Sequence, residues 1–515
     1  MKRFFATVAI FATTLLSSLS IQGQGMYDAL RYSQIYYYGT ARSIGMGNAM
    51  GSLGGDLGAL SYNPAASGVY RYSEMAITPA LTTSNSKSDY LGKISNSNKS
   101  RFSISNIGWV GGIETGYRRG ITGVNFSIAT NQTNSYNFLT TASGQEAKSS
   151  YLGSLAANMP YGVTPEDLTM TDGAPTFPFS HSDASWSTIL AWNGGLIDTV
   201  GGPHSYYGAT ENITSDGVVI PGTLDQNFRN IRNGYTNDFI FNVSGNINDI
   251  VFIGLNVTLQ DIWFTEYSSY SEKAVNPLLF QTGFSHFTAE YNQTTTGLGV
   301  NVKGGIIVRP VAGLTLGGSI STPTWIFLNE SWDESIEGYT AMYGAAQIYS
   351  PEGFMQYRVR TPFRWGLSAG YTFGKKVAIG IDYERSDYSQ IKMADQDNDR
   401  TIFSYENQDI SNYLKATNNL RAGIEYKVIP ELALRAGYNF YDSSTKEFDN
   451  SIHYVSAGLG YRNKGGFFID LAYMQQCNRN VDKYTLYDSY ENFVAPTLTE
   501  SYLKWRLALT VGVRF

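Results

Sequence analysis

Cysteine, histidine and charge are all scarce in this chain of 515 residues. Its one cysteine, Cys477, excludes an internal disulfide framework and any cysteine-based metal site. Charged residues make up 16% of the sequence, whereas about a quarter is typical of soluble proteins. The four histidines stand without the spacing of metal ligands, at His181, His204, His286 and His453. We therefore expect no cofactor and no metal site.

Long apolar runs are missing beyond the N-terminus. Lys2 and Arg3 precede a short apolar stretch at 4–19, and small and polar residues follow at 20–25. This is the pattern of a secretory signal peptide, so we expect residues 1–24 to be removed on export. No cysteine lies nearby to carry a lipid anchor. After this segment, no apolar run is long enough to span a bilayer as a helix.

Aromatic residues and glycine, by contrast, are abundant, with Tyr 38, Phe 27, Trp 8 and Gly 53. Aromatic girdles, glycine-dense strands and modest charge suit a transmembrane β-barrel, whose polar atoms line an interior. Without Lys2 and Arg3 the chain has 35 basic and 43 acidic residues. An exported acidic protein has no electrostatic basis for binding nucleic acid.

The last thirteen residues, 503–515, alternate between an apolar face and a polar, basic face. Alternation with period two indicates a strand with one apolar side. In a soluble sandwich that side would face a core, and in an outer-membrane barrel it would face lipid. The terminal Phe515 resembles the signal by which barrel-assembly machinery recognises its substrates, so we expect that machinery as a partner. The apolar face comprises Trp505, Leu507, Leu509, Val511, Val513 and Phe515.

Similar segments recur along the chain, and very short connections alternate with long polar ones. Short turns on one side and long loops on the other are typical of bacterial outer-membrane barrels, but not of sandwiches or propellers. We therefore predict an all-β, transmembrane antiparallel barrel of about fourteen strands in residues 73–515. The long connections are 85–100, 137–234, 329–353, 394–417 and 481–500. The strands are expected near 73–84, 101–114, 119–136, 235–248, 250–270, 285–309, 312–328, 354–374, 376–393, 418–428, 431–442, 451–463, 465–480 and 501–515.

The connection 137–234 is too long to be structureless. Its segments 150–159 and 185–196 look helical, and the second carries Trp186 and Trp192. These tryptophans form either a local core of a folded external loop or a hydrophobic landing surface for a ligand. Both interpretations remain open on the sequence alone.

Residues 25–72 do not alternate, and small residues dominate their centre. Small residues allow close backbone packing and turns with positive φ, so this segment suits a plug inside the barrel. The Gly45-x-Gly47 pair does not follow a strand in a βαβ unit, which argues against dinucleotide binding.

The same segment resembles the FadL-type family of outer-membrane transporters for long-chain fatty acids and other hydrophobic compounds. The matching motifs are Gly39-Thr-Ala-Arg-Ser-Ile-Gly-Met-Gly-Asn-Ala, Gly55-Asp56 and Tyr62-Asn63-Pro64-Ala65, with further echoes at 321–325, 360–364, 374–376 and 382–384. The resemblance implies a fourteen-stranded barrel plugged by an N-terminal hatch with an Asn-Pro-Ala motif. It suggests hatch or gating roles for Gly45, Gly47, Asp56, Asn63, Pro64 and Ala65.

Basic residues are expected on the lumen faces. The alternation in 354–374 predicts that Arg358, Arg360 and Arg364 point inward. An internal ion-pair network that braces barrel and hatch is one interpretation. Another is that some of these arginines, Arg358 or Arg360 foremost, receive a substrate carboxylate, because guanidinium matches carboxylate geometry. Further members of the network would be Arg421, Arg435, Lys504 and Arg506, with Asp382, Glu384, Glu425 and Asp470 as partners.

The sequence therefore predicts a monomeric outer-membrane channel that moves hydrophobic small molecules inward by diffusion, with outer-membrane lipid around it. A polar-solute porin, a haem-binding receptor and a surface adhesin are the alternatives. An enzyme is not indicated, because no Gly-x-Ser-x-Gly motif precedes a helix and no Ser–His pair can be placed.

Overall fold

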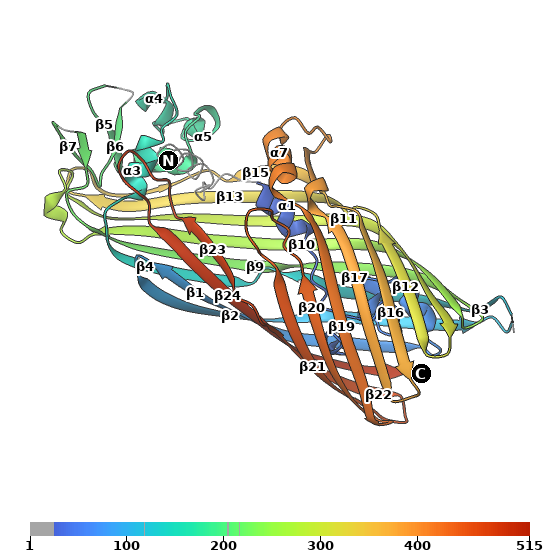
Figure 1. The fold of residues 1–515 in the computed structure, drawn as a ribbon. Coiled ribbons are helices and arrows are strands. Elements are labelled where there is room, and N and C mark those ends of the chain that lie inside the picture. Colours follow the sequence, from blue (N-terminus) through green and yellow to red (C-terminus); the bar gives the residue numbers. More distant parts are fainter. Residues whose placement is uncertain (1–24, 118, 203–204, 216) are drawn as a thin grey trace, which may run out of the picture.

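The computed structural model describes residues 25–117, 119–202, 205–215 and 217–515, which form a closed antiparallel β-barrel around an N-terminal hatch (Figure 1). The predicted signal peptide lies outside the described residues. Closure comes from β1 and β24, which pair from Glu74↔Arg514 to Tyr90↔Leu498. Six of the twenty strands in this sheet continue a neighbour in the wall, so the wall has the fourteen strands predicted.

The wall strands follow one another in chain order. They are β1 (Glu74–Tyr90), β2 (Lys93–Glu114), β3 (Ile121–Ser135) with β4 (Phe138–Ala147), β9 (Leu224–Ile247), β10 (Val251–Ala274), β11 (Phe284–Val311), β12 (Leu314–Ser321) with β13 (Trp325–Thr340), β14 (Gly344–Tyr349) with β15 (Gly353–Arg360) and β16 (Arg364–Phe373), β17 (Val377–Asp387) with β18 (Lys392–Asp395), β19 (Ala416–Ile429), β20 (Leu432–Tyr441), β21 (Ile452–Arg462), β22 (Phe467–Gln476) with β23 (Asn480–Thr485), and β24 (Thr497–Arg514).

The two faces of the wall differ in polarity as a membrane barrel requires. On β10, Ile253, Leu255 and Val257 are exposed on the outside, whereas Asn256 and Thr258 are buried against the lumen. Apolar side chains therefore meet lipid, and polar side chains meet the hatch. The same alternation on β24 confirms the face assignment predicted for the C-terminal strand.

The strands β9, β10 and β11 are 24, 24 and 28 residues long, although about 10 residues suffice to cross a bilayer. The apolar outer face of β10 ends at Trp263, and polar residues continue it. The tall side of the barrel thus extends beyond the membrane. The expected loops 85–100 and 329–353 are corrected accordingly, because most of their residues lie in strands. Outside the membrane both strand faces can be polar, so alternation no longer marks a strand.

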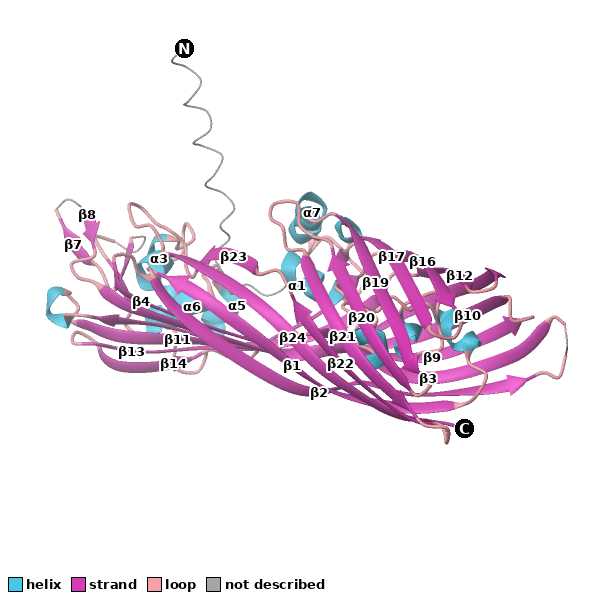
Figure 2. Ribbon diagram, turned by 60° about the horizontal axis from the view of Figure 1, so that its bottom comes forward, coloured by secondary structure: helices cyan, strands magenta, loops and turns pink. Residues whose placement is uncertain are grey.

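The segment between β4 and β9 folds into a compact unit, here called the external head, which also confirms the two expected helices (Figure 2). With α7 (Ser404–Tyr413) it lies at the end of the barrel away from the C-terminus. Its elements are α3 (Tyr151–Ala157), α4 (Pro165–Leu168), α5 (Phe177–His181), α6 (Trp186–Asn193), and the strand pairs β5 (Ile197–Thr199) with β6 (Tyr206–Gly208) and β7 (Asn212–Thr214) with β8 (Gly217–Val219). Short 3₁₀ turns η3 (Pro277–Leu279) and η4 (Tyr388–Gln390) follow β10 and β17.

The hatch comprises α1 (Met26–Ser33), α2 (Ala41–Gly45), η1 (Gly58–Ser61) and η2 (Pro64–Val69), and nearly all of residues 38–70 are buried in the lumen. Across the described ranges, no helix is long and apolar enough to cross a membrane.

Glycines of the wall allow the hatch backbone to lie directly on the barrel backbone. A Cβ atom on Gly380, Gly423 or Gly437 would collide with the backbone of Ala49, Met46 or Gly47. Across the lumen, a Cβ on Gly254 would strike Pro64, and one on Gly305 would strike Asn63. Gly47 itself has φ +59, and a side chain there would meet the backbone of β20. Hatch and wall therefore fit only because both lack side chains at these contacts.

The alternation of turns and loops fixes which end faces outward. A peptide tag inserted near Gly201 in the external head should be labelled on intact cells, because the head lies outside the membrane. A tag at Lys375, in the short turn between β16 and β17, should be labelled only after the outer membrane is opened. Labelling of Lys375 alone on intact cells would reverse the assignment.

A bulky side chain on the inner face of the wall should displace the hatch. We expect Gly437→Leu to raise single-channel conductance in planar bilayers, as should deletion of residues 39–66, because barrel strands pair among themselves without the hatch. The matched control is Gly245→Leu, since Gly245 lies on the outer face of β9 and a Cβ there would make only ordinary contact with Ile253 Cγ1 at 3.7 Å. Unchanged conductance in both hatch variants would show that the hatch does not block the barrel.

Candidate functional site

The hatch is fixed by side chains of the Asn-Pro-Ala motif. The Asn63 amide donates to Gly51 O at 2.6 Å and to Ile306 O of the wall at 3.3 Å, and its oxygen accepts from Ala65 N at 3.0 Å. Pro64 begins η2, where its missing N–H is not needed. The Asn63 side chain therefore bonds to backbone of both the hatch and the wall.

Asp56 also holds the hatch together. Its carboxylate accepts from Thr40 Oγ1 at 2.7 Å and from Gly58 N at 2.8 Å. The Thr40 oxygen in turn caps α2 by accepting from Ser43 N. The carboxylate thus ties the first half of the hatch to its second half. Gly45 packs against Gly458 of β21, where a Cβ would lie 3.2 Å from the Gly458 Cα.

Ion pairs join the hatch to the wall, as the bracing interpretation predicts. Arg42 of the hatch pairs with Glu425 at 3.1 Å, and Arg435 bridges Glu425 at 2.7 Å and Asp470 at 2.6 Å. Glu384 forms a second centre, which Arg421 approaches to 3.4 Å and Arg364 to 3.8 Å. Removing one partner from such a buried pair costs about 3–5 kcal/mol. Arg364 is therefore part of this network.

The inward orientation predicted for Arg358 and Arg360 is wrong. Tyr357 and Val359 face the lumen, while Arg358 lies outside, 4.8 Å above the Phe327 ring. The strand is interrupted at 361–363, where Pro362 cannot donate to the ladder. The interruption shifts the alternation, so Arg364 points inward although Arg358 and Arg360 do not.

A seam divides the wall between β2 and β4. The β2–β3 ladder covers only Asn106–Glu114, and above it the chain turns inward at 136–137 so that β4 pairs with β9. Within the described part of the chain, residues 93–105 of β2 pair with β1 alone. Tyr36 N and Tyr38 N of the hatch donate to Thr133 O and Gln132 O of β3. The hatch thereby bonds to part of the β3 edge that β2 does not pair with.

Side chains seal this seam where a backbone ladder is missing. The hydroxyl groups of Ser84 and Ser86 donate to the carbonyl oxygens of residues 137 and 139 at 2.9 and 2.6 Å. Ser97 and Thr141 join their hydroxyl groups at 2.5 Å. A row of isolated side-chain bonds resists separation less than a continuous ladder does, because each contributes only about 0.5–1.5 kcal/mol. The seam is therefore a line of the wall that side chains hold in place of a backbone ladder.

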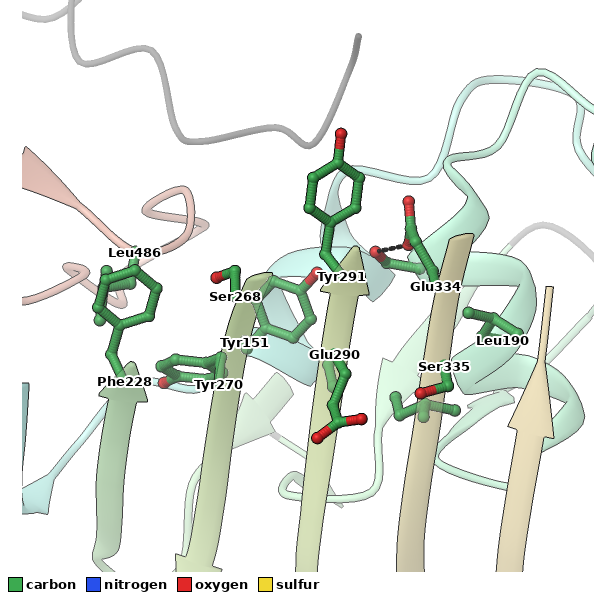
Figure 3. A pocket seen from close by; sticks show the side chains of 13 residues that line it. Tyr151, Leu190, Phe228, Ser268, Tyr270, Glu290, Tyr291, Glu334, Ser335 and Leu486 are labelled. Atoms are coloured by element: carbon green, nitrogen blue, oxygen red, sulfur yellow. Dashed lines mark hydrogen bonds between the residues drawn. The ribbon is translucent and has the colours of Figure 1, made fainter. Parts of the chain in front are cut away.

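The external head encloses a cavity of about 50 Å³ against the inner face of the tall wall (Figure 3). Ser187 Oγ donates to Glu334 at 2.6 Å on the cavity side, where Tyr291 also points, while Glu290 points to the opposite side of the sheet. The volume holds about one or two waters, so a larger ligand requires the cavity to widen. The apolar lining consists of Tyr151, Leu190, Phe228, Tyr270, Ala289, Tyr291, Ile336 and Leu486.

Trp186 and Trp192 do not line this cavity. The Trp186 indole donates to Phe179 O at 3.1 Å and packs on Trp332 at 5.6 Å, and the Trp192 indole donates to Thr169 Oγ1 at 3.0 Å. Both rings belong to the apolar core of the head. The helix α6 instead offers Ser187 and Leu190, which the sequence does not distinguish from other residues of an apolar helix.

The aromatic residues of the cavity wall were also missed. Phe228, Tyr270 and Tyr291 come from three strands that pair beyond the membrane, so no local pattern joins them. In the described ranges, no group of three His, Cys, Asp or Glu side chains is placed to hold a metal ion.

Comparisons with known proteins were made on the sequence and on the fold. The family profile described as "Outer membrane protein transport protein (OMPP1/FadL/TodX)" matches residues 246–515. The fold is similar to the crystal structure of a Pseudomonas aeruginosa FadL homologue, with a TM-score of 0.54 and 13% identity over 94% of this chain and 100% of that one. It is also similar to the P. putida toluene transporter TodX, with a TM-score of 0.53 and 12% identity over 93% and 99%. No curated protein sequence matches.

A pH dependence is expected in the external head. Burial raises the pKa of Glu211 to about 7 from 4.5, although its carboxylate accepts from Gly208 N at 2.7 Å. The folded head therefore keeps a proton on Glu211 that the unfolded head releases. The contribution of this proton to the free energy of unfolding is lost as the pH rises through about 7. We expect proteases to cut the head faster at about pH 8 than at about pH 5.

The control for this experiment is Glu211→Gln, which keeps the shape of the side chain without its titration. Cleavage in this variant should depend less on pH than in the wild type, and should be slow at both values. Equal pH dependence in the two proteins would assign the effect to titratable groups other than Glu211.

Proposed function

Because this chain belongs to the family of outer membrane transport proteins that includes FadL and TodX, we propose that it lets hydrophobic small molecules, such as long-chain fatty acids, diffuse inward across the outer membrane. The protein is an outer-membrane β-barrel of that transporter family. Diffusion needs neither a cofactor nor a nucleotide. The cargo and the route are the parts that require a test.

The seam is the observation that carries the proposed route. The hatch fills the lower lumen and is held by buried ion pairs and backbone contacts, so the straight path to the periplasm is blocked. The lower end of the seam, by contrast, lies beside Phe102 and Ile104, whose side chains are 66% and 46% exposed on the outer face. Release of a hydrophobic molecule from the seam into lipid is more favourable in free energy than its release into water.

The ligand would first be captured in the cavity of the external head. Its aromatic lining suits an apolar body, and Glu334 with Ser187 supplies one polar point. The described lining of this cavity contains no basic residue, which argues against the binding of a ligand carboxylate there. Widening of the cavity would involve the helices α3 and α6, which pack on the wall from above.

The alternatives receive less support. A polar-solute porin needs an open aqueous lumen, whereas the hatch buries its residues against both sides of the wall. A haem receptor or an adhesin would use the external head, and no observation in the head favours either. The hatch residues Asn63 and Pro64 are proposed as the fixed part of the plug. We propose that the exposed Phe515 serves barrel assembly and that the channel works as a monomer.

A disulfide across the seam tests the route. In a Cys477→Ser background, Ser97→Cys with Thr141→Cys should form a bridge, because the two native hydroxyl oxygens lie 2.5 Å apart. Uptake of a radiolabelled hydrophobic compound into proteoliposomes should fall severalfold on oxidation, since the seam can no longer part. Reduction should restore uptake.

The matched control is Thr83→Cys with Ser100→Cys. These residues already face each other in the β1–β2 ladder, with their hydroxyl oxygens 2.9 Å apart, so a bridge there adds no new constraint across the seam. Uptake that stays unchanged when the seam is locked would direct the route through the hatch.

A further inference from the structure

Glu334 is a buried acid in the wall of the cavity under the external head. The residue lies on β13 and is 4% exposed. Its Oε2 atom accepts from Ser187 Oγ at 2.6 Å, whereas Oε1 accepts no hydrogen bond from the described residues. The ion pairs of the described chain do not include Glu334. Burial of a carboxylate is unfavourable unless opposite charge or hydrogen bonds compensate it.

A second carboxylate under the head shows how the protein compensates a buried acid by its own groups. Glu272 of β10 is 0% exposed, and both of its oxygens accept hydrogen bonds. The donors are Ser150 Oγ at 2.6 Å, Tyr151 N at 2.8 Å, Tyr270 Oη at 2.8 Å and Gln226 Nε2 at 2.9 Å. Glu334 has one such donor. Its second oxygen is therefore available to a ligand.

Aromatic rings share the cavity wall with this carboxylate. Tyr291 of β11 is the cross-strand partner of Glu334, and Figure 3 shows both side chains on the same side of the sheet. The rings of Tyr151 and Tyr270 pack 5.4 Å apart, and Phe228 adds a fourth ring. The face of an aromatic ring attracts a cation, and more strongly where water is excluded. The carboxylate and the rings together favour a positively charged group.

The size of the cavity favours a primary ammonium group. Its volume of about 50 Å³ holds about one or two waters, and an –NH₃⁺ group takes about the space of one. Such a group carries three N–H donors, of which one would bond to Glu334 Oε1. The hydroxyl of Ser268 in the lining is a further acceptor. A quaternary ammonium group is larger and has no N–H to donate.

Among the described residues, the titratable groups around Glu334 are acids and phenols. The cations of the neighbouring strands are exposed, namely Arg229, Lys273 and His286. Helix α6, which covers the cavity, contains no titratable residue. The acids and phenols are Asp333 on β13, Glu290 and Tyr291 on β11, Tyr270 and Glu272 on β10, Tyr151 on α3, Tyr349 at the end of β14, Glu352 after it, and Tyr487 beside Leu486.

We propose that Glu334 and the rings around it bind the primary ammonium group of a hydrophobic amine, so that the external head captures amines in preference to neutral compounds of the same length. This inference rests on the proposed function and specifies a class of its cargo. A free small molecule suits the site better than the lysine of a folded partner, because α3, α6 and Leu486 cover the cavity.

The test is calorimetric titration of the purified full-length protein, in a non-ionic detergent at pH 8, with hexylamine and with hexanol. The wild type should bind the amine more tightly than the alcohol. Glu334→Gln should weaken hexylamine binding by about 10- to 100-fold, the loss expected for a hydrogen bond between charged groups. Hexanol affinity should stay unchanged, because the alcohol forms no ion pair.

The pH dependence of binding gives a second readout that needs no variant. Burial raises the pKa of Glu334 to about 7 from 4.5, with a contribution from Asp333 and against the bond from Ser187. The carboxyl group is therefore ionised at pH 8 and mostly protonated at pH 6, while an alkylammonium keeps its proton at both. Hexylamine affinity in the wild type should fall about 10-fold from pH 8 to pH 6. Binding at pH 7 should release protons, measured in two buffers of different ionisation enthalpy.

The matched control is Glu290→Gln, since the Glu290 side chain points to the opposite side of the sheet (Figure 3). Both affinities should stay unchanged in this variant, and the shift in electrophoretic mobility on heating checks the folding of each protein. Equal affinity for amine and alcohol in the wild type, hexylamine binding that survives Glu334→Gln, or binding without proton release would overturn the ammonium site. Hexanol binding would then still support the proposed function, whereas a wild type that binds neither ligand would contradict that function as well.

Discussion

The close approach of two backbones, that of the hatch and that of the wall, is the constraint on which the rest of the structure depends. It requires glycine on the wall at Gly380, Gly423 and Gly437, and small residues on the hatch between Met46 and Ala49. Because no side chains separate the two surfaces, the lower lumen has no continuous path. The proposed route therefore leaves the barrel at the seam and does not pass through the hatch.

The buried arginines of the described lumen differ in whether a carboxylate compensates their charge. Glu384 and Glu425 each serve two arginines, and Tyr37 and Arg42 of the hatch bond to these two carboxylates, so the networks hold the hatch to strands β16 to β22. Each charge in such a pair already has a hydrogen-bonded partner of opposite charge. Exchanging that partner for a ligand would therefore bring no gain in binding free energy. Among the described residues Arg506 pairs with no carboxylate, and it stands on β24, between β22 and β1 in the wall. The basic residues of the lumen therefore form two distinct groups.

The seam and the external head share a physical property that the rest of the barrel lacks. Both are closed by side chains instead of a backbone ladder, through serine hydroxyl groups in one case and an apolar core in the other. Side-chain contacts can be exchanged for contacts with a ligand, one at a time, whereas ladder bonds break cooperatively. In the proposed route, the places that open are set by where strand pairing stops, at Asn106 on β2 and at Ser135 on β3.

The sequence by itself determined the barrel, its fourteen strands and the hatch, because alternation, turn length and small-residue content are local properties. The faces of β10 and β24 were read correctly inside the membrane, where lipid forces every second residue to be apolar. Outside the membrane lipid imposes no such alternation, so the strands at 85–100 and 329–340 were predicted as loops. The tertiary structure alone decided the orientation of Arg358, which an interruption at 361–363 reversed, and the isolation of Arg506. Both depend on which strands become neighbours, and residues joined across a ring of strands, such as Arg506 and Gln132, lie too far apart in the chain for any local pattern to relate them.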